Sequence, residues 1–323
     1  GDNSDRHTAT PVAALSGIHV DKVVAGYEHS LALAANGHLY AWGANDSGQL
    51  GITHTFDVNA PQRLLYFDGM TVTDVAAGKE HTLALTESGD VYAWGLNNYG
   101  QLGIAGVSVV TEPHLVSALA GMDVVAVYAG GLHSMALLAD GSLYSWGRNV
   151  FGQLGNDSTA DSVIPVQVQL PPEITIAALC TGDYHNLLLT DEGEVFAWGH
   201  NNFGQLGLAD IEDRLVPEFV SSLADFSVEY IACGHSFSLV SAHEHVWGFG
   251  LNTYGQLGLG GRYFGDQSTP RPLPRYSPRT QLAHTLAAGI STASVTGPDQ
   301  TTYSCGDSVG DGAPGNGRYF TQN

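Results

Sequence analysis

The chain has 323 residues, including 41 glycines and 13 prolines, and 43% of its residues are hydrophobic. Asp and Glu number 32 against 11 Lys and Arg, so the formal net charge is −21. Such a surface repels phosphate groups, and we expect neither nucleic acid nor an anionic membrane as a partner. The sequence contains no run of 18 apolar residues that could span a bilayer.

Residues 1–9 are polar, and we expect them to form a mobile N-terminal extension. The chain does not begin with methionine, so removal of a signal segment or a flanking domain is an expectation as well. The compartment of this soluble chain, cytoplasmic or secreted, stays open.

A segment of the sequence, GYEHSLALAANGHLYAWGANDSGQLG in its first copy, recurs along the chain. Five copies start 52 residues apart, at Gly26, Gly78, Gly130, Gly182 and Gly234, and a divergent sixth starts at Gly289. A fixed period of this length is typical of solenoids and propellers.

Each copy contains two short apolar runs, HSLALA and HLYAW in the first, joined by a turn signal that contains glycine. Another apolar run precedes each copy, and a segment marked by proline follows the first four, at Pro61, Pro113, Pro165 and Pro217. Each period therefore supplies about four strands. Because the central runs are apolar on both faces, their sheets are expected to pack between neighbouring sheets. We predict an all-β fold, a single β-propeller of four-stranded antiparallel blades over residues 10–323.

The two ends of the chain suggest how the propeller closes. The sixth copy stops before a proline-marked strand, whereas the start of the chain, TATPVAALSG, resembles that missing strand. We expect Pro11–Leu15 to complete the sheet begun near Gly289, which closes a ring without an open edge. Six blades are favoured, with a seven-bladed ring or a solenoid of sheets as alternatives.

The repeated pattern of A-G-x-x-H-S-L-A-L, V-Y-A-W-G-x-N and x-G-Q-L-G resembles the regulator of chromosome condensation repeat family. The resemblance extends from about Pro11 to the C-terminus and implies a β-propeller, usually of seven blades. Members of this family include exchange factors for the small GTPase Ran, a plant ultraviolet-B photoreceptor, domains of ubiquitin ligases and secreted inhibitors of β-lactamases. The resemblance therefore implies the fold more narrowly than the function.

Two slots of the repeat carry residues that could have a chemical role. One holds a histidine in four copies, at His29, His81, His133 and His185, and the other holds a tryptophan, at Trp42, Trp94, Trp146 and Trp198. Equivalent histidines lie one blade apart and cannot share a metal ion, so we expect structural imidazoles bonded to loop backbone. The tryptophans occupy a core slot, and no surplus of them remains to form a chromophore.

The Gly-Gln-Leu-Gly turns lack the lysine of a phosphate-binding loop, and we expect the glutamine side chain to cap each turn. Cys180 and Cys233 replace small apolar residues, so we interpret them as buried, and nothing in their spacing indicates a disulfide. His243 and His245 on one strand face could supply half of a metal site, but no third ligand accompanies them.

The sequence contains neither Cys-x-x-Cys nor His-Glu-x-x-His, and the many acids are expected to be solvated surface charge. We interpret the chain as a non-enzymatic monomer that needs no cofactor and no metal.

Positions of the repeat that vary between copies are not required to build the blade. They lie after the repeat glycine and after Trp-Gly, in loops expected to share one rim of the propeller. We predict that a partner protein with a basic or mixed surface binds this rim. The predicted contact residues are Tyr27, Glu28, Glu80, Leu132, Arg148, Asp183, Tyr184, His200 and His235.

The alternative function is that of a guanine-nucleotide exchange factor or regulator for a Ran-like small GTPase. As the resemblance implies, such exchange factors press an insertion from one blade against the GTPase. The regular 52-residue spacing leaves no long insertion in the first four periods, and only the stretch from Gly258 to Arg279 exceeds its counterparts.

Overall fold

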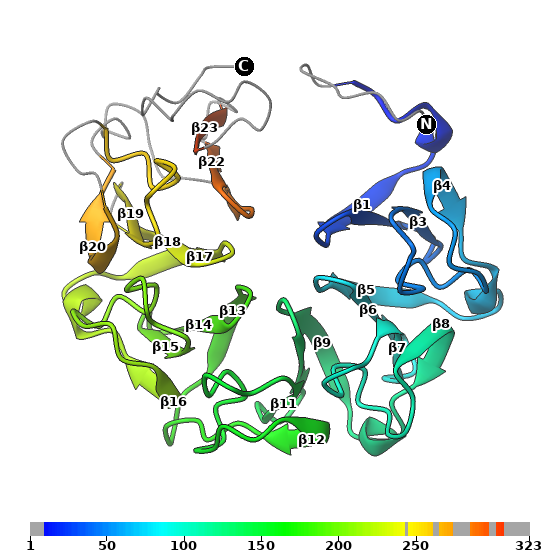
Figure 1. Cartoon of the computed structure of the whole chain (residues 1–323), viewed down its shortest axis with the longest axis horizontal. Coiled ribbons are helices and arrows are strands. Elements are labelled where there is room, and N and C mark those ends of the chain that lie inside the picture. The colour runs from blue at the N-terminus through cyan, green and yellow to red at the C-terminus, as the bar shows by residue number, and fades with distance from the viewer. Residues whose placement is uncertain (1–9, 243–244, 261–264, 274–284, 297–301, 307–323) are drawn as a thin grey trace. The chain divides into compact units, whose positions relative to one another are not determined.

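The computed structural model describes residues 10–242, 245–260, 265–273, 285–296 and 302–306. These residues form six antiparallel sheets, five of four strands and one of three, with strands hydrogen-bonded in chain order (Figure 1). The prediction of an all-β propeller with six blades is confirmed. Contacts divide the chain into two compact units, residues 1–149 with 160–168, and residues 150–159 with 169–323.

The first unit contains blades 1 to 3. Blade 1 consists of β1 (Val20–Ala25), β2 (His29–Ala34), β3 (Leu39–Gly43) and β4 (Val58–Arg63). Blade 2 consists of β5 (Val72–Ala77), β6 (His81–Thr86), β7 (Val91–Leu96) and β8 (Val109–Leu115). Blade 3 consists of β9 (Val124–Ala129), β10 (His133–Leu138), β11 (Leu143–Gly147) and β12 (Ser162–Gln167).

The second unit contains blades 4 to 6. Blade 4 consists of β13 (Ile176–Thr181), β14 (His185–Thr190), β15 (Val195–Gly199) and β16 (Arg214–Phe219). Blade 5 consists of β17 (Val228–Cys233), β18 (Phe237–Ala242), β19 (His245–Gly250) and β20 (Gln267–Pro272). Blade 6 consists of β21 (Thr285–Ala288), β22 (Thr292–Thr296) and β23 (Thr302–Gly306).

Helical structure in the described residues is limited to four single turns, η1 (Ala13–Leu15), η2 (Leu65–Phe67), η3 (Ser117–Leu119) and η4 (Ser221–Leu223). None of these turns is long and apolar enough to cross a membrane.

The second strand of a blade is its most buried strand. All six residues of β6, β14 and β18 are buried, because apolar or small polar side chains alternate on faces that both pack against neighbouring sheets. The fourth strand instead carries a proline, at Pro61, Pro113, Pro165, Pro217 and Pro270. A proline cannot donate to a further strand, so it protects the outer edge from pairing with another chain.

One backbone carbonyl of each Gly-Gln-Leu-Gly turn joins neighbouring blades. Trp94 Nε1 and Thr82 Oγ1 of blade 2 donate hydrogen bonds to the carbonyl of Gln49 in blade 1, over 2.9 and 2.8 Å. Blade 3 repeats this contact with Trp146 and Ser134 on the carbonyl of Gln101, and blade 4 repeats it with Trp198 and Asn186 on Gln153. Where the sixth copy lacks the tryptophan, the thiol of Cys305 donates to the carbonyl of Gln256 over 3.1 Å.

The repeated histidine belongs to the same contact. His81 Nε2 lies 2.9 Å from Ser134 Oγ of the next blade, and the same atoms of His29 and His185 lie 3.2 and 3.0 Å from the hydroxyls of Thr82 and Ser238. Because each hydroxyl already donates its proton to a glutamine carbonyl, the imidazole must be the donor. The structural role is confirmed, and the partner of Nε2 is a side chain of the next blade, which the sequence did not predict.

The repeat glycine is required by the position of that imidazole. A Cβ atom at Gly78 would lie 2.0 Å from Cε1 of His81, so no side chain fits between the ring and the turn.

The glutamine side chain caps its own turn, as the sequence predicts. Gln101 Oε1 accepts a hydrogen bond from the backbone nitrogen of Tyr99 over 2.9 Å, and Gln49, Gln153, Gln205 and Gln256 do the same in their turns.

Four aspartates also have a structural role, which corrects the expectation that the acids are only solvated charge. Each carboxylate accepts a hydrogen bond from the backbone nitrogen of an asparagine. The pairs are Asp57 with Asn45, Asp161 with Asn149, Asp213 with Asn201 and Asp266 with Asn252.

The strand predicted at Pro11–Leu15 is wrong. Ala13–Leu15 forms the 3-10 turn η1, which corresponds to the turns that follow the fourth strand in blades 1, 2 and 4. The 52-residue period aligns Leu15 with Phe67 of η2, so the residues equivalent to β4 lie at positions 6–11. Most of these positions, and the predicted mobile extension at 1–9, lie outside the described residues.

The interpretation of the cysteines is also wrong, because Cys180 of β13 and Cys233 of β17 form a disulfide. Cys180 lies two residues before its repeat glycine, whereas Cys233 lies one residue before its own. Successive strand residues point to opposite faces, so this offset of one lets the two side chains face each other between neighbouring blades. The same sequence separation of 53 residues joins His81 to Ser134.

Two further features of the sequence lie outside the described residues. These are His243 of the suggested metal half-site and residues 261–264 and 274–279 of the stretch from Gly258 to Arg279.

The shared carbonyl predicts a cost for removing its tryptophan donor. The Trp146→Phe variant keeps an aromatic ring but loses the bond to Gln101 and leaves a small cavity, so we expect its free energy of unfolding to fall by about 1–3 kcal/mol. Chemical denaturation measures this change. As a control, Tyr254→Phe alters an exposed ring and should change the free energy by less than about 0.5 kcal/mol. Equal stability of both variants and the parent chain would contradict the role of the carbonyl.

The buried histidines predict a loss of stability in acid. Burial lowers the pKa of His81 to about 3 and that of His29 to about 4, so the unfolded chain binds their protons first as the pH falls below about 6.5. Each of these two histidines should therefore lower the free energy of unfolding by about 2 kcal/mol as the pH falls from about 7.5 to about 5.

A variant separates this effect from the titration of carboxylates. His81→Asn cannot take up a proton, so its free energy of unfolding should fall less steeply over the same pH range. Parallel pH profiles for the variant and the parent chain would show that His81 does not titrate on unfolding.

Candidate functional site on the variable loops

Two variable loops meet in each of the first five blades. The residue after Trp-Gly, or its counterpart in blade 5, donates its backbone N–H to the carbonyl of the second residue after the repeat glycine. The pairs are Ala44 with Glu28, Leu96 with Glu80, Arg148 with Leu132, His200 with Tyr184 and Leu251 with Ser236, all within 2.8–3.0 Å. Both kinds of variable slot therefore lie side by side at the same end of each blade.

Glycine makes this approach possible. Gly95 has a φ of +104°, and a Cβ atom there would lie 2.4 Å from the carbonyl oxygen of Glu80. Any other residue would push the two loops apart.

A third variable slot adds aromatic side chains to these loops and was missed in the sequence. It is the residue before Gly-Gln-Leu-Gly, occupied by Tyr99, Phe151, Phe203 and Tyr254 in four copies. Its backbone is fixed by the glutamine cap, while its side chain is half-buried or, for Tyr254, 50% exposed. The signal in the sequence that could have revealed this position is the recurrence of an aromatic residue directly before the Gly-Gln-Leu-Gly turn.

In the first unit the loops pair cations with aromatic rings. The guanidinium of Arg148 lies 4.4 Å from the centre of the Tyr99 ring, and the ammonium of Lys79 lies 4.9 Å from the centre of the Tyr27 ring. Both distances allow a cation–π attraction. Glu80 accepts a hydrogen bond from Ser47 Oγ over 2.9 Å, so this acid is also held in place.

In the second unit the loops form an aromatic cluster, which we call the Phe151 cluster and which consists of Phe151, Tyr184, His200 and Phe203. The Phe151 ring lies 4.2 Å from the His200 ring and meets the Tyr184 ring edge-on at 5.3 Å. The Phe203 ring meets the His200 ring edge-on, with the ring centres 6.0 Å apart. Burial lowers the pKa of His200, which favours a neutral ring within this cluster.

An ion pair borders the Phe151 cluster. His235 Nδ1 of blade 5 lies 2.7 Å from a carboxylate oxygen of Asp183 in blade 4, and the backbone nitrogen of Asp183 donates to the carbonyl of His235 over 3.2 Å. These two contacts fix the loops of neighbouring blades against each other.

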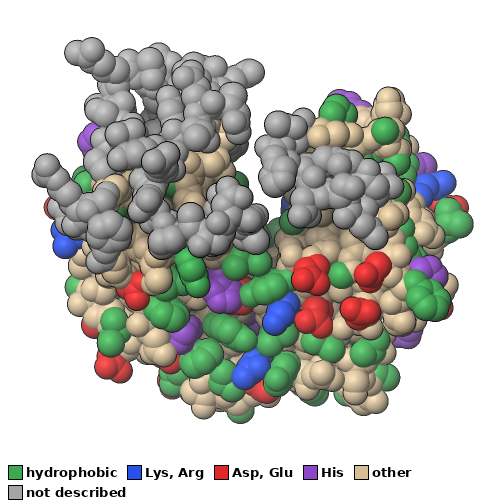
Figure 2. All heavy atoms as spheres, turned by 45° about the horizontal axis from the view of Figure 1, so that its top comes forward, with side chains coloured by type: hydrophobic (Ala, Val, Ile, Leu, Met, Phe, Trp, Pro, Cys, Tyr) green, Lys and Arg blue, Asp and Glu red, His purple; other side chains and the backbone are tan. Residues whose placement is uncertain are grey.

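The predicted contact residues differ in how far their side chains are exposed to a partner. Leu132 and His200 are only 7% and 8% exposed, and Asp183 is buried in its ion pair, so their side chains support the surface and do not present it. Glu28 is exposed, and the half-buried residues are Tyr27, Glu80, Arg148, Tyr184 and His235. Figure 2 shows hydrophobic, histidine, basic and acidic side chains next to one another on the face it presents.

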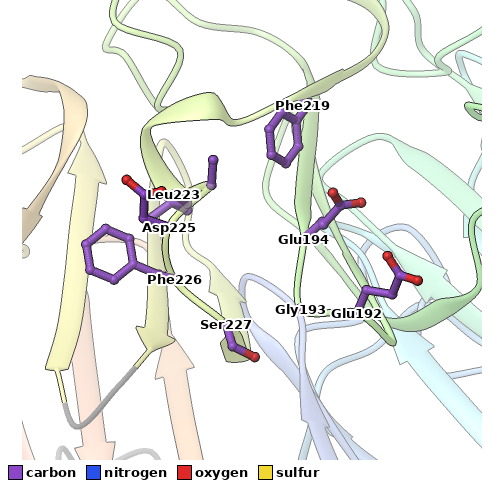
Figure 3. A pocket seen from close by; sticks show the side chains of 9 residues that line it. Glu192, Gly193, Glu194, Phe219, Leu223, Asp225, Phe226 and Ser227 are labelled. Atoms are coloured by element: carbon purple, nitrogen blue, oxygen red, sulfur yellow. The ribbon is translucent and has the colours of Figure 1, made fainter.

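A hollow in the second unit provides a second candidate site. It has a volume of about 310 Å³ and lies between the β14–β15 turn of blade 4 and the η4–β17 connection of blade 5 (Figure 3). Glu192, Glu194 and Phe219 lie on one side, and Asp225 and Phe226 lie on the other. The hairpin turn places this hollow at the opposite end of the blade from the Phe151 cluster. The part of the chain that the structure describes holds no group of three or more metal-ligating side chains, here or elsewhere.

Comparison with known proteins decides which propeller family this is. The family model described as RCC1-like domain matches residues 1–321. The chain belongs to the RCC1-like domain family. The family resemblance noted in the sequence is therefore confirmed.

Two curated relatives show the range of proteins that contain such a domain. The chain is 36% identical to the ultraviolet-B receptor UVR8 of Arabidopsis thaliana, over 80% of its own length and 59% of the receptor. It is 33% identical to the E3 ubiquitin-protein ligase HERC2 of Mus musculus, over 94% of its own length and 6% of the ligase. The chain thus spans less than two thirds of each of these relatives.

Solved structures agree on the fold. Human WBSCR16 superimposes with a TM-score of 0.72 at 28% identity, covering 84% of this chain and 70% of that one. Prp20p of Saccharomyces cerevisiae superimposes with a TM-score of 0.76 at 24% identity, covering 87% and 70% of the two chains.

The ring contacts of the variable loops predict a measurable coupling. In a double-mutant cycle of Arg148→Met and Tyr99→Leu, the two changes should fall short of additivity by about 0.5–1 kcal/mol in unfolding free energy. The matched cycle of Arg148→Met with Tyr27→Leu pairs Arg148 with a ring that lies under Lys79 instead, and it should be additive. Additivity in both cycles would mean that the stacking of Arg148 on Tyr99 contributes nothing to stability.

Proposed function

We propose that this RCC1-like domain is a non-enzymatic platform that binds a partner protein through its variable loops. The observation that supports the proposal is the concentration of aromatic and charged side chains on backbone that the blade holds rigid. Tyr, Trp, Phe and Arg are the residues that contribute most energy to protein interfaces. Here such residues occupy slots that the repeat leaves free, namely Tyr27, Tyr99, Arg148, Phe151, Tyr184, Phe203 and Tyr254.

Rigid support favours binding through these loops. Every glutamine cap and every bond between the two variable loops fixes backbone before a partner arrives. A surface that is ordered beforehand loses less conformational entropy on binding than a flexible loop does.

The charge of the domain favours the kind of partner. With a net charge of −21, the domain attracts a partner that carries a basic or mixed surface and speeds their encounter. Exposed acids such as Glu28 lie among the aromatic residues and could pair with basic residues of that partner.

The test compares the two ends of the blades. A partner is first identified by affinity capture and mass spectrometry, and its dissociation constant is then measured by calorimetry. The variants Arg148→Ala, Phe203→Ala and Tyr254→Ala should each weaken binding by about 1–3 kcal/mol, since these side chains would be anchors of the interface. Their effect on unfolding should stay near about 1 kcal/mol or less.

The control variants change the hairpin turns at the other end. Asp140→Ala and Glu192→Ala alter exposed acids and should leave the dissociation constant unchanged. If these two variants abolish binding while the variable-loop variants bind normally, the partner uses the opposite end of the blades, where the acidic hollow lies.

Regulation of a Ran-like small GTPase is the second candidate function, and membership of the RCC1-like domain family favours it. The short loops of the regular 52-residue repeats weigh against an exchange mechanism that needs a long insertion. Release of labelled nucleotide from a Ran-like GTPase, measured with catalytic amounts of the domain, tests this candidate. A rate equal to the spontaneous rate would remove exchange activity from consideration.

A further inference from the structure

We propose that Cys180 and Cys233 form a reversible thiol–disulfide site, at which a small disulfide such as oxidised glutathione controls how firmly two of the variable loops are held together. This inference concerns the chemistry of the chain itself, and it stands or falls independently of the partner proposed above.

The disulfide lies next to two of the variable loops. Cys180 lies in β13 and Cys233 ends β17, the first strands of blades 4 and 5, with Cα atoms 5.6 Å apart. Asp183 follows Cys180 by three residues, in the loop after β13, and His235 follows Cys233 by two residues, in the loop after β17. The disulfide thus lies at the base of the ion pair and the backbone hydrogen bond that join these two loops.

The first unit contains the same loop contact without a disulfide. The backbone nitrogen of Lys79 donates to the carbonyl of Gly131 over 3.0 Å, as that of Asp183 does to the carbonyl of His235. At the positions of Cys180 and Cys233, blades 2 and 3 carry Ala76 and Ala129. Neighbouring blades therefore pack without a covalent bond, and we expect the reduced chain to stay folded while its loops between blades 4 and 5 become looser.

The third cysteine does not compete for the exchange. Cys305 is 8% exposed, and burial raises the pKa of its thiol to about 12. Its sulfur also donates to the carbonyl of Gln256, so it is held away from the surface. Cys180 and Cys233 are half-buried, and both pack at the margin of a hydrophobic cluster of the second unit.

The exchange is balanced in atoms and electrons. The thiolate of one cysteine attacks oxidised glutathione, breaks its S–S bond and forms a mixed disulfide while one glutathione thiol leaves. The second cysteine thiolate then attacks the protein sulfur of that mixed disulfide and releases the second glutathione. Two protein thiols are oxidised, one glutathione disulfide is reduced to two thiols, and the protons lost by the cysteines pass to the leaving thiolates. An excess of reduced glutathione or another thiol reverses both steps.

The first experiment tests formation of the bond. The reduced chain is incubated with oxidised glutathione, unfolded, labelled with N-ethylmaleimide and weighed by mass spectrometry. Of the 3 cysteines, only Cys305 should take the label, and peptide mapping should find Cys180 linked to Cys233. Three labels, or a glutathione that stays attached, would overturn the proposal.

The second experiment tests the effect on the loops by hydrogen–deuterium exchange. Reduction should make the amides of residues 182–186 and 234–238 exchange about tenfold faster, because the loop contact then opens more often. Residues 78–82 and 130–134 of the first unit carry the matched contact without cysteines and should not change. Equal exchange in both redox states, or faster exchange throughout the chain, would contradict local control.

Variants assign the effect to the pair. Cys180→Ser and Cys233→Ser should exchange like the reduced chain at every glutathione ratio, whereas Cys305→Ser should still respond. If a serine variant does not fold, the comparison of the oxidised and reduced parent chain decides the proposal alone. A Cys305→Ser chain that no longer responds would show that the wrong cysteines were chosen.

Discussion

The packing of neighbouring blades depends on the hydrogen bonds that the backbone carbonyl of the glutamine in each Gly-Gln-Leu-Gly turn accepts from the next blade. Gln101 shows the arrangement: its carbonyl accepts from the indole of Trp146 and the hydroxyl of Ser134, and that hydroxyl accepts from His81. Histidine and glutamine come from one blade, while tryptophan and serine come from the next. A buried carbonyl that lost both donors would carry the full cost of its desolvation. In the fifth copy, where Phe249 replaces the tryptophan, the carbonyl of Gln205 still accepts from Ser238.

This interlock explains how the surface can vary. The glutamine side chain fixes the turn, the asparagine and aspartate pairs fix the long loop, and glycine lets the two variable loops meet. The side chains left over, such as Tyr99 and Arg148, contribute little to this framework. Their replacement therefore alters the surface without changing the blade.

The acidic character of the chain has two origins in the structure. Some carboxylates are required by the fold, such as Asp57, which accepts a backbone hydrogen bond, and Asp74, which accepts from Lys22 and from the backbone of Val127. Others, such as Glu28 and Glu192, are exposed and set the electrostatic field around the domain. Composition reports only the sum of the two groups, so the share that a partner meets is smaller than the net charge suggests.

The sequence by itself determined the repeat, its strands and the structural role of the positions that stay constant between copies. It did so because a period of 52 residues repeats the same local pattern of turns and apolar faces. It also placed the variable loops together within each blade. The tertiary structure alone decided which side chains face one another across blades. Cys180 bonds to Cys233 because alternate strand residues point to opposite neighbouring blades, and Phe151 contacts His200 because the loop backbones bring distant positions together. For the same reason Leu132, a variable residue, is buried, and η1 stands where a strand was predicted: position along the chain does not reveal the depth or register of a residue within the packed sheets.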